Sequence, residues 1–182
     1  MSRLVTILAL LALAVTQEYL PKEGPMPICD VFTKDIARSG INDFWKVDQN
    51  GWSLVFSALP IRPNVITEVT FYLVNGNGFG IGCGRLDKTN EGIDGVGLAT
   101  DTGLKWNKNG PDAYSSPAIA GDKIKMTIDM RPMKYTLSFA KNNLDLGIAY
   151  GGLNLYRSDI YIYFGINQVG HRIKVIDYKV IE

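Results

Sequence analysis

Apolar and polar residues alternate along three short stretches in the second half of the chain. The first runs from Ile124 to Met130, the second from Tyr135 to Phe139, and the third from Leu144 to Tyr150. Alternation with a period of two is the pattern of a half-buried strand. A proline-containing turn separates the first two stretches and an Asn-Asn turn the last two. The pattern predicts an antiparallel meander, whose apolar face needs a second sheet to cover it.

The same stretch, residues 121–150, resembles the core of the SPRY domain. The family pattern has a glycine-aspartate pair, a strand ending in aspartate, a serine-phenylalanine strand, a lysine-asparagine turn and a leucine-glycine run. These elements appear here in that order as Gly121-Asp122, Ile128-Asp129, Leu137-Ser138-Phe139, Lys141-Asn142 and Leu146-Gly147-Ile148-Ala149-Tyr150. The resemblance implies an all-β, two-sheet antiparallel concanavalin-like β-sandwich, a jelly roll that recognises other proteins and has no catalytic activity.

The resemblance covers residues 52–181, with weaker support from residues 32–50. The chain departs from the family at Asn64, where glycine is usual in a loop, and at Arg157, where proline is usual. We therefore expect the SPRY-like domain to occupy residues 30–182. Residues 17–29, which contain three prolines and a glycine, are expected to form a linker before it.

The first fifteen residues, Met1 to Val15, are strongly apolar. One arginine precedes twelve apolar or small residues, and Ala12-Leu13-Ala14 offers a cleavage site of small residues. The segment predicts either a secretory signal peptide over residues 1–16 or a retained N-terminal apolar helix packed on the sandwich. It is too short for a transmembrane span. A cleaved leader implies a secreted, extracellular protein, whereas a retained one favours the cytoplasm, where most family members function.

Composition and charge fit one globular domain of 182 residues. Hydrophobic residues make up 46% and charged residues 20%, and the formal net charge is +1. Nineteen glycines and eight prolines are spread along the chain, as expected for many turns between short strands. Because lysine and arginine are neither in excess nor clustered, the balance argues against a nucleic-acid partner.

The residues that carry most enzyme chemistry are scarce. His171 is the single histidine, so neither a zinc cluster with two histidines nor a second catalytic histidine can be built. Cys29 and Cys83 are the two cysteines, and they could form one bridge in an exported chain or remain two separate apolar side chains. We expect no enzyme activity, no metal and no cofactor.

Two segments superficially match ligand-binding motifs. Residues 75–84, NGNGFGIGCG, are rich in glycine but lack the lysine and hydroxyl residue of a phosphate loop, so they predict a turn and a strand with a bare face. Residues 87–95 look like a calcium loop, but Thr89 and Leu98 stand where acidic ligands are required. Neither segment therefore predicts a ligand site.

The resemblance implies that loops at one edge of the sandwich bind a peptide or loop of a partner protein. The corresponding segments are residues 60–64, 87–94, 109–116 and 154–158. Aromatic residues and arginine dominate interface hot spots. The candidate partner-binding residues are therefore Arg62, Tyr114, Tyr156 and Arg157.

Two other functions remain open from the sequence. Concanavalin-like sandwiches also serve as lectins, and Trp106 with Tyr114 could stack on a sugar in a secreted carbohydrate-binding domain. A chain with a single short domain also fits an adaptor or a structural subunit of a larger assembly. The sequence favours the protein-binding module over both.

Overall fold

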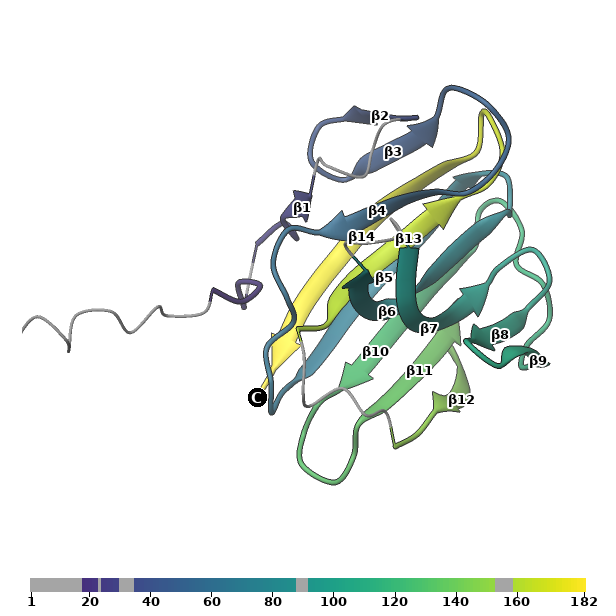
Figure 1. The fold of residues 1–182 in the computed structure, drawn as a ribbon. Coiled ribbons are helices and arrows are strands. Elements are labelled where there is room, and N and C mark those ends of the chain that lie inside the picture. The colour runs from purple at the N-terminus through teal and green to yellow at the C-terminus, as the bar shows by residue number, and fades with distance from the viewer. Residues whose placement is uncertain (1–17, 23, 30–34, 88–91, 153–158) are drawn as a thin grey trace, which may run out of the picture.

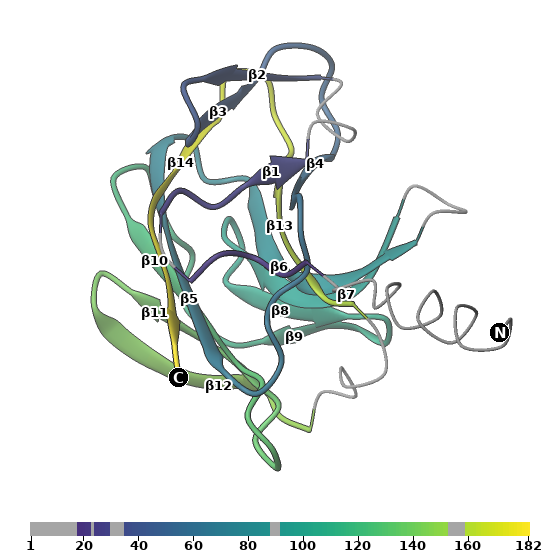
Figure 2. The same cartoon turned by 90° about the vertical axis from the view of Figure 1, so that its left-hand side faces the viewer.

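The computed structural model describes residues 18–22, 24–29, 35–87, 92–152 and 159–182. Every regular element in these ranges is a β-strand, and the strands form two antiparallel sheets of seven. The sheets face each other as two layers (Figures 1 and 2). No part of the described chain forms a helix with the length and hydrophobicity needed to cross a membrane. The predicted two-sheet β-sandwich is therefore confirmed.

We call the first sheet the glycine sheet, because several of its central residues are glycines. In spatial order its strands are β1 (Ile28–Cys29), β4 (Ser53–Ser57), β13 (Tyr161–Ile166), β6 (Phe79–Asp87), β7 (Gly92–Ala99), β8 (Leu104–Asn107) and β9 (Gly110–Ala113). We call the second the meander sheet. In spatial order its strands are β12 (Leu144–Tyr150), β11 (Thr136–Lys141), β10 (Lys123–Asp129), β5 (Ile66–Asn75), β14 (Arg172–Ile181), β3 (Asp43–Lys46) and β2 (Ile36–Ser39).

The hydrophobic core lies between the two sheets and is built by alternate residues of each strand. Phe164 of β13 is fully buried and contacts rings from the opposite sheet, with centroid distances of 5.1 Å to Phe44 and 5.7 Å to Phe71. Met126 and Phe139 of the meander point into the same core. Burying each such side chain stabilises the fold by about 1.5–3 kcal/mol.

The meander predicted from the alternating pattern is present. β10 pairs with β11 and β11 with β12, both antiparallel, and the turn after β10 lies at residues 131–134. β12 is the edge strand, and its side chains Leu144 and Ile148 are exposed. The glycine-rich residues 79–84 lie in β6, the middle strand of the other sheet, as the family resemblance implies.

Residues 18–22 and 24–29, where the sequence predicted a linker, pack on the sandwich. Leu20 and Met26 are fully buried, and Leu20 N–H donates to the Pro60 carbonyl at 2.9 Å. The Tyr178 hydroxyl donates to the Pro21 carbonyl at 2.6 Å. The segment is extended, but its apolar side chains and its backbone find partners on the sandwich. The apolar segment Met1 to Val15 lies outside the described residues.

The two cysteines are free and belong to different strands of the glycine sheet. Cys29 lies in β1 and Cys83 in β6, with β4 and β13 between them. Three strand spacings amount to about 14 Å, twice the Cα separation that a disulfide allows. The bridge considered from the sequence is therefore wrong, and the thiols are separate.

Candidate functional site

The outer face of the glycine sheet is unusually bare at its centre. Phe79, Ile81 and Cys83 of β6 point into the core, so the glycines between them face outward. Gly82 pairs with Gly97 of β7, which is also on the outer face. This row of positions without side chains gives the sheet a floor on which larger side chains can lie.

Tyr163 of β13 lies across Gly82 and Gly97. An added Cβ on Gly82 would meet the Tyr163 hydroxyl at 2.3 Å and the Val96 carbonyl oxygen at 2.1 Å. The Tyr163 hydroxyl donates to that same carbonyl at 3.0 Å, and burial raises the pKa of the phenol well above its ordinary value. The two glycines are therefore needed for Tyr163 to lie flat on the sheet.

Trp52, just before β4, covers a second part of the same floor. An added Cβ would lie 3.4 Å from its ring at Gly80 and 3.0 Å at Gly165. Gly80 and Gly165 are register partners on neighbouring strands. The Trp52 side chain is half exposed, at 51%, so one face of the indole packs on glycine while much of the ring stays accessible.

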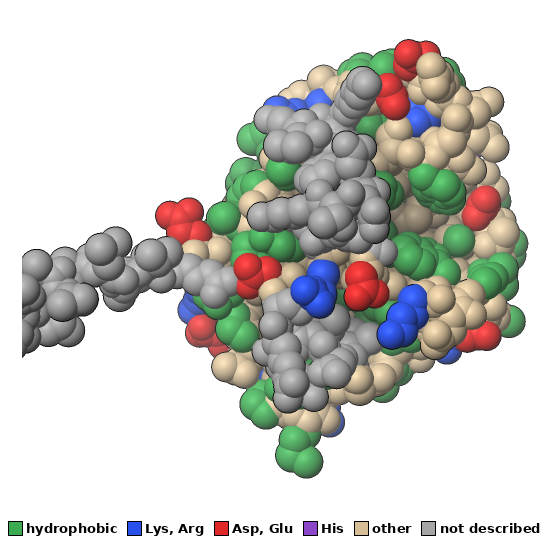
Figure 3. Space-filling model, viewed as in Figure 1, with side chains coloured by type: hydrophobic (Ala, Val, Ile, Leu, Met, Phe, Trp, Pro, Cys, Tyr) green, Lys and Arg blue, Asp and Glu red, His purple; other side chains and the backbone are tan. Residues whose placement is uncertain are grey.

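Between these rings lies a cavity of about 480 Å³, which we call the aromatic pocket. Its walls are Trp52, Leu54, Trp106 and Tyr163. Its floor and rim are Gly80, Ala99, Asn107, Gly110 and Pro111. Figure 3 looks onto this sheet and shows hydrophobic side chains around a hollow.

Two properties make the aromatic pocket a candidate site. The Trp106 ring packs against Tyr163 with a centroid distance of 5.8 Å. Because Tyr163 is buried, this contact holds the Trp106 wall of the pocket in place. None of the described residues that line the pocket is charged. Concave, mostly apolar sites with few polar groups are the usual form of ligand pockets.

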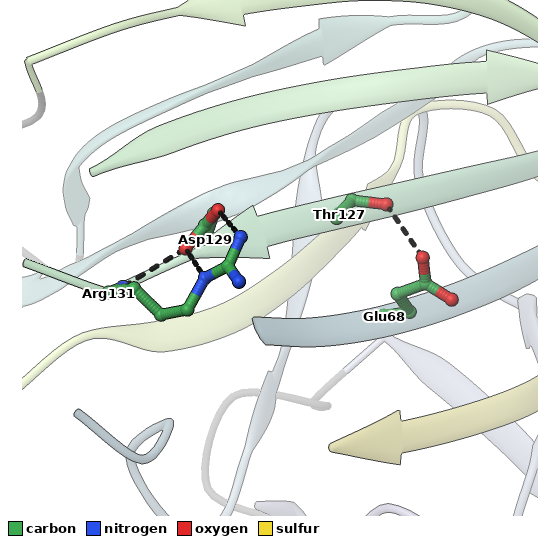
Figure 4. Close-up of polar contacts among 4 residues, drawn as sticks. All are labelled: Glu68, Thr127, Asp129 and Arg131. Carbon is green, nitrogen blue, oxygen red and sulfur yellow. Dashed lines mark hydrogen bonds and ion pairs between the residues drawn. The ribbon is translucent and has the colours of Figure 1, made fainter. Parts of the chain in front are cut away.

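The outer face of the meander sheet is polar, in contrast. Glu68 of β5 accepts from Lys179 at 3.0 Å and Lys125 at 3.5 Å, and it lies 3.4 Å from the Thr127 hydroxyl (Figure 4). Burial acts to raise the pKa of Glu68, but the bond from Lys179 and the two lysine charges outweigh it and lower the pKa. The negative charge of Glu68 is therefore balanced by the positive charges of Lys125 and Lys179.

Three further ion pairs belong to the same polar face. Arg131 holds both carboxylate oxygens of Asp129, at 3.0 and 2.7 Å, and this hydrogen bonding lowers the Asp129 pKa (Figure 4). Asp43 of β3 is bound by Arg172 and by Lys174 of β14. Paired charges of this kind form a solvated surface. A cavity of about 430 Å³ on this face is lined by Trp45 and Arg172, and Arg172 is already paired with Asp43, so this cavity carries charge where the aromatic pocket has none.

Neither Arg62 nor Tyr114 lines the aromatic pocket, and the two side chains contact different parts of the sandwich. Arg62 donates from Nε to the Leu20 carbonyl at 2.9 Å, which fastens the N-terminal segment. Tyr114 contacts β11 and β12. Tyr156 and Arg157 lie outside the described residues. Partner binding by these four residues therefore stays a prediction.

Tyr114 is half-buried. Its hydroxyl donates to the Gly147 carbonyl at 2.6 Å and accepts from Phe139 N–H at 3.3 Å. The β11–β12 register shifts at this point. The hydroxyl therefore replaces a ladder hydrogen bond lost at the bulge, and the main effect of burial is to raise the pKa of the phenol and keep it protonated.

One predicted binding segment does reach the pocket. Gly110 and Pro111 fall within residues 109–116 and form part of the rim, next to Trp106. The other lining residues were missed, because a sequence does not show which outward positions of neighbouring strands lie together. Alternating glycines in residues 79–84 were the available signal, since a bare strand face between aromatic strands leaves room for a ligand.

Residues able to bind metal or act as nucleophiles do not gather in the described parts of the chain. No three His, Cys, Asp or Glu side chains there form a metal-binding group. Burial raises the pKa of the Cys83 thiol to about 12. His171 is half-buried, packs against Phe79 and accepts from Gly78 N–H at 3.3 Å. These residues serve the fold.

No family model and no curated protein sequence matches the chain. Solved structures do match. The SPRY domain of human HERC1 has a TM-score of 0.65 at 17% identity, covering 85% of this chain and 96% of that domain. The Drosophila melanogaster neuralized NHR1 domain has a TM-score of 0.58 at 15% identity, covering 85% and 99%.

The carbohydrate-binding module CBM66 from Bacillus subtilis is also similar. Its TM-score is 0.56 at 11% identity, and the match covers 89% of this chain and all of the module. All three proteins are concanavalin-like β-sandwiches. At these identities the likeness shows the fold alone. The chain has a SPRY-like single-domain fold, as its residues 121–150 predicted.

Proposed function

We propose that this chain is a non-catalytic protein–protein interaction module that binds a peptide or loop of a partner in the aromatic pocket. The pocket itself carries the proposal, because it places two tryptophans and a buried tyrosine around about 480 Å³ of apolar space. Aromatic side chains at the centre of a surface patch are the usual anchors of protein binding. Two of the similar structures, a SPRY and an NHR1 domain, agree with such a role.

The pocket suits an apolar segment better than a reacting substrate. Its described lining contains neither a carboxylate nor a histidine, cysteine or lysine. Tyr163 is the one titratable side chain in it, and its hydroxyl already donates to the Val96 carbonyl at 3.0 Å. Its volume lies within the range of small-ligand sites and exceeds a single side chain. The rim residues Gly110 and Pro111 lie in β9, within one of the segments predicted to bind, which the structure forms partly as a strand and not wholly as a loop. A partner in the pocket would extend across that segment.

Carbohydrate binding is the second candidate, supported by the likeness to CBM66 and by the two tryptophans that line the pocket. Sugar rings stack on aromatic faces, but their hydroxyls also need hydrogen-bond acceptors. Among the described lining residues, Asn107 is the main polar group outside the backbone, and its Oδ1 already accepts from Asn109 N–H at 2.7 Å. Apolar peptide binding is therefore the better fit.

A displayed peptide library tests the proposal, because it samples many possible partner sequences at once. The full chain is the bait, and each enriched peptide is then measured against the Ala99→Leu variant, whose larger side chain would fill the pocket floor. Enriched peptides should bind the wild type and lose most of their affinity for Ala99→Leu. A glycan array run with the same pair covers the alternative. Peptides that bind both proteins equally, or glycans that distinguish them, would overturn the proposal.

A further inference from the structure

We propose that the partner segment contains proline and binds the aromatic pocket as a polyproline II turn. This inference rests on the proposed function and names the chemistry of its ligand. Three features of the pocket lead to it: the flat aromatic surfaces around a glycine floor, the absence of charge in the described lining, and three side-chain hydrogen-bond donors that have no described acceptor.

The walls provide flat surfaces of the kind that proline rings bind. Trp52 lies on one side of the cavity over Gly80, and Trp106 lies on the other against Tyr163. Grooves lined by aromatic residues recognise polyproline II segments in other folds, because the ligand is extended before it binds and loses little entropy. Pro111 on the rim adds a further rigid apolar surface.

The floor allows the ligand to lie close to the sheet. Gly80 has no side chain, and apart from Trp52 nothing lies within 4 Å of where its Cβ would be. Ala99, the register partner of Gly80 on β7, adds only a methyl group. A polyproline II helix has three residues per turn and a rise of about 3.1 Å per residue. The cavity of about 480 Å³ is large enough for roughly one such turn.

The hydrogen-bonding groups of the pocket favour a ligand that accepts and does not donate. The indole N–H groups of Trp52 and Trp106 and the Asn107 amide nitrogen donate to no other described residue. Two nearby carbonyls are already bonded: Asn107 Oδ1 accepts from Asn109 N–H, and the Val96 carbonyl accepts from the Tyr163 hydroxyl. Proline lacks an N–H and keeps its carbonyl, so it matches this supply.

The lack of charge excludes other common peptide ligands. Phosphorylated and acidic motifs are recognised by clustered arginines. The described lining has no charged residue. Arg172 and Lys179 are paired with Asp43 and Glu68 on the other sheet. A strand added to a sheet edge would not use this pocket, because the pocket lies on a face.

The test is an NMR titration of the full chain with a capped ten-residue polyproline peptide. The chain has three tryptophans. Trp45 lies on the meander sheet, with the Arg172 guanidinium carbon 5.6 Å from its ring centroid. Its indole signal is therefore an internal reference. We expect the Trp52 and Trp106 indole signals to shift saturably while that of Trp45 stays in place. A capped peptide of alternating glycine and serine, of equal length, should shift none of them.

Two variants locate the effect. Ala99→Leu should weaken polyproline binding at least about tenfold by filling the floor, and Trp106→Ala should do the same by removing a wall. Trp45→Ala is the matched control and should keep wild-type affinity. Because Trp106 supports Tyr163 and its removal could unfold the sheet, Ala99→Leu keeps the test decisive.

A capped leucine-containing peptide without proline separates this inference from the proposed function. If it shifts the Trp52 and Trp106 signals and polyproline does not, the proline inference is overturned and the binding module stands. If both peptides leave these two signals unchanged, the proline inference is also overturned, and the library selection decides the proposed function. Equal polyproline affinity in Ala99→Leu and wild type would overturn the assignment to the pocket.

Discussion

At the scale of single residues, glycines set the shape of the candidate site. Gly82 and Gly97 let Tyr163 lie flat, and Gly80 leaves the floor open below Trp52. None of the three has a positive φ, so their importance comes from close packing and not from a turn. A substitution at each should therefore cost stability in proportion to the contact that its new Cβ makes.

A pair of substitutions in one strand tests this explanation. Gly82→Ala places a Cβ 2.1 Å from a backbone oxygen, which cannot move easily, and should lower the free energy of unfolding by about 2–3 kcal/mol. The Cβ of Gly80→Ala meets only the Trp52 ring, at 3.4 Å. This substitution should change the free energy of unfolding by less than about 0.5 kcal/mol. Urea denaturation measures both. Equal effects would show that the glycines are not placed for packing.

Tyr114 supplies a second prediction at this scale. Tyr114→Phe removes the hydroxyl that joins Phe139 N–H to the Gly147 carbonyl and should destabilise the fold by about 1 kcal/mol. Tyr72→Phe is the control, because the Tyr72 hydroxyl has no hydrogen bond to a described residue. If Tyr114→Phe keeps full stability but lowers the affinity for a library-selected peptide, Tyr114 is a binding residue, as the sequence suggested, and not a structural one.

At the scale of elements, the strands that alternate cleanly were predictable and the irregular ones were not. β10, β11 and β12 follow the expected boundaries closely, because one face of each is apolar or partly so. The burial of Leu20 and Met26 was missed, since prolines around them indicated a linker. Local turn signals say how a segment bends but not whether its side chains reach a core.

Ion pairs between strands make stability depend on pH. A hydrogen bond from Arg172 is the main reason that the pKa of Asp43 lies below its ordinary value of 3.8. The unfolded chain therefore binds this proton more readily than the folded one. The stabilisation is complete above the unfolded pKa and is lost as the pH falls through the folded pKa.

Asp43→Asn isolates this contribution. Unfolding free energies at pH 6 and pH 2.5 should differ more in the wild type than in Asp43→Asn, by about 1 kcal/mol or less for a partly exposed pair. The other carboxylates titrate in both proteins, so they cancel in the comparison. An identical pH dependence would mean that the pair linking β3 and β14 contributes nothing to stability.

At the scale of the whole molecule, the two outer faces of the sandwich differ in chemistry. The meander sheet presents paired charges, whereas the glycine sheet presents the aromatic pocket. The SPRY-like fold could be predicted because residues 121–150 carry its pattern. The pocket could not, because Trp52, Trp106 and Tyr163 are far apart in sequence and meet only through strand order.

The separation of the two thiols gives a prediction for the whole fold. Under native conditions iodoacetamide should modify Cys29 first, because Cys83 is fully buried and burial raises its pKa to about 12. In denaturant without reducing agent both cysteines should be modified, as shown by intact mass. A denatured chain that takes up no label would contain the disulfide that the strand order excludes.

The most direct measurement of the central claim is the affinity of one library-selected peptide for wild type, Ala99→Leu and Arg62→Ala. Binding in the aromatic pocket predicts at least about tenfold weaker binding for Ala99→Leu, because its floor is filled, and little change for Arg62→Ala. The opposite result, full affinity in Ala99→Leu and a large loss in Arg62→Ala, would move the binding site to the loops and contradict the role of the pocket.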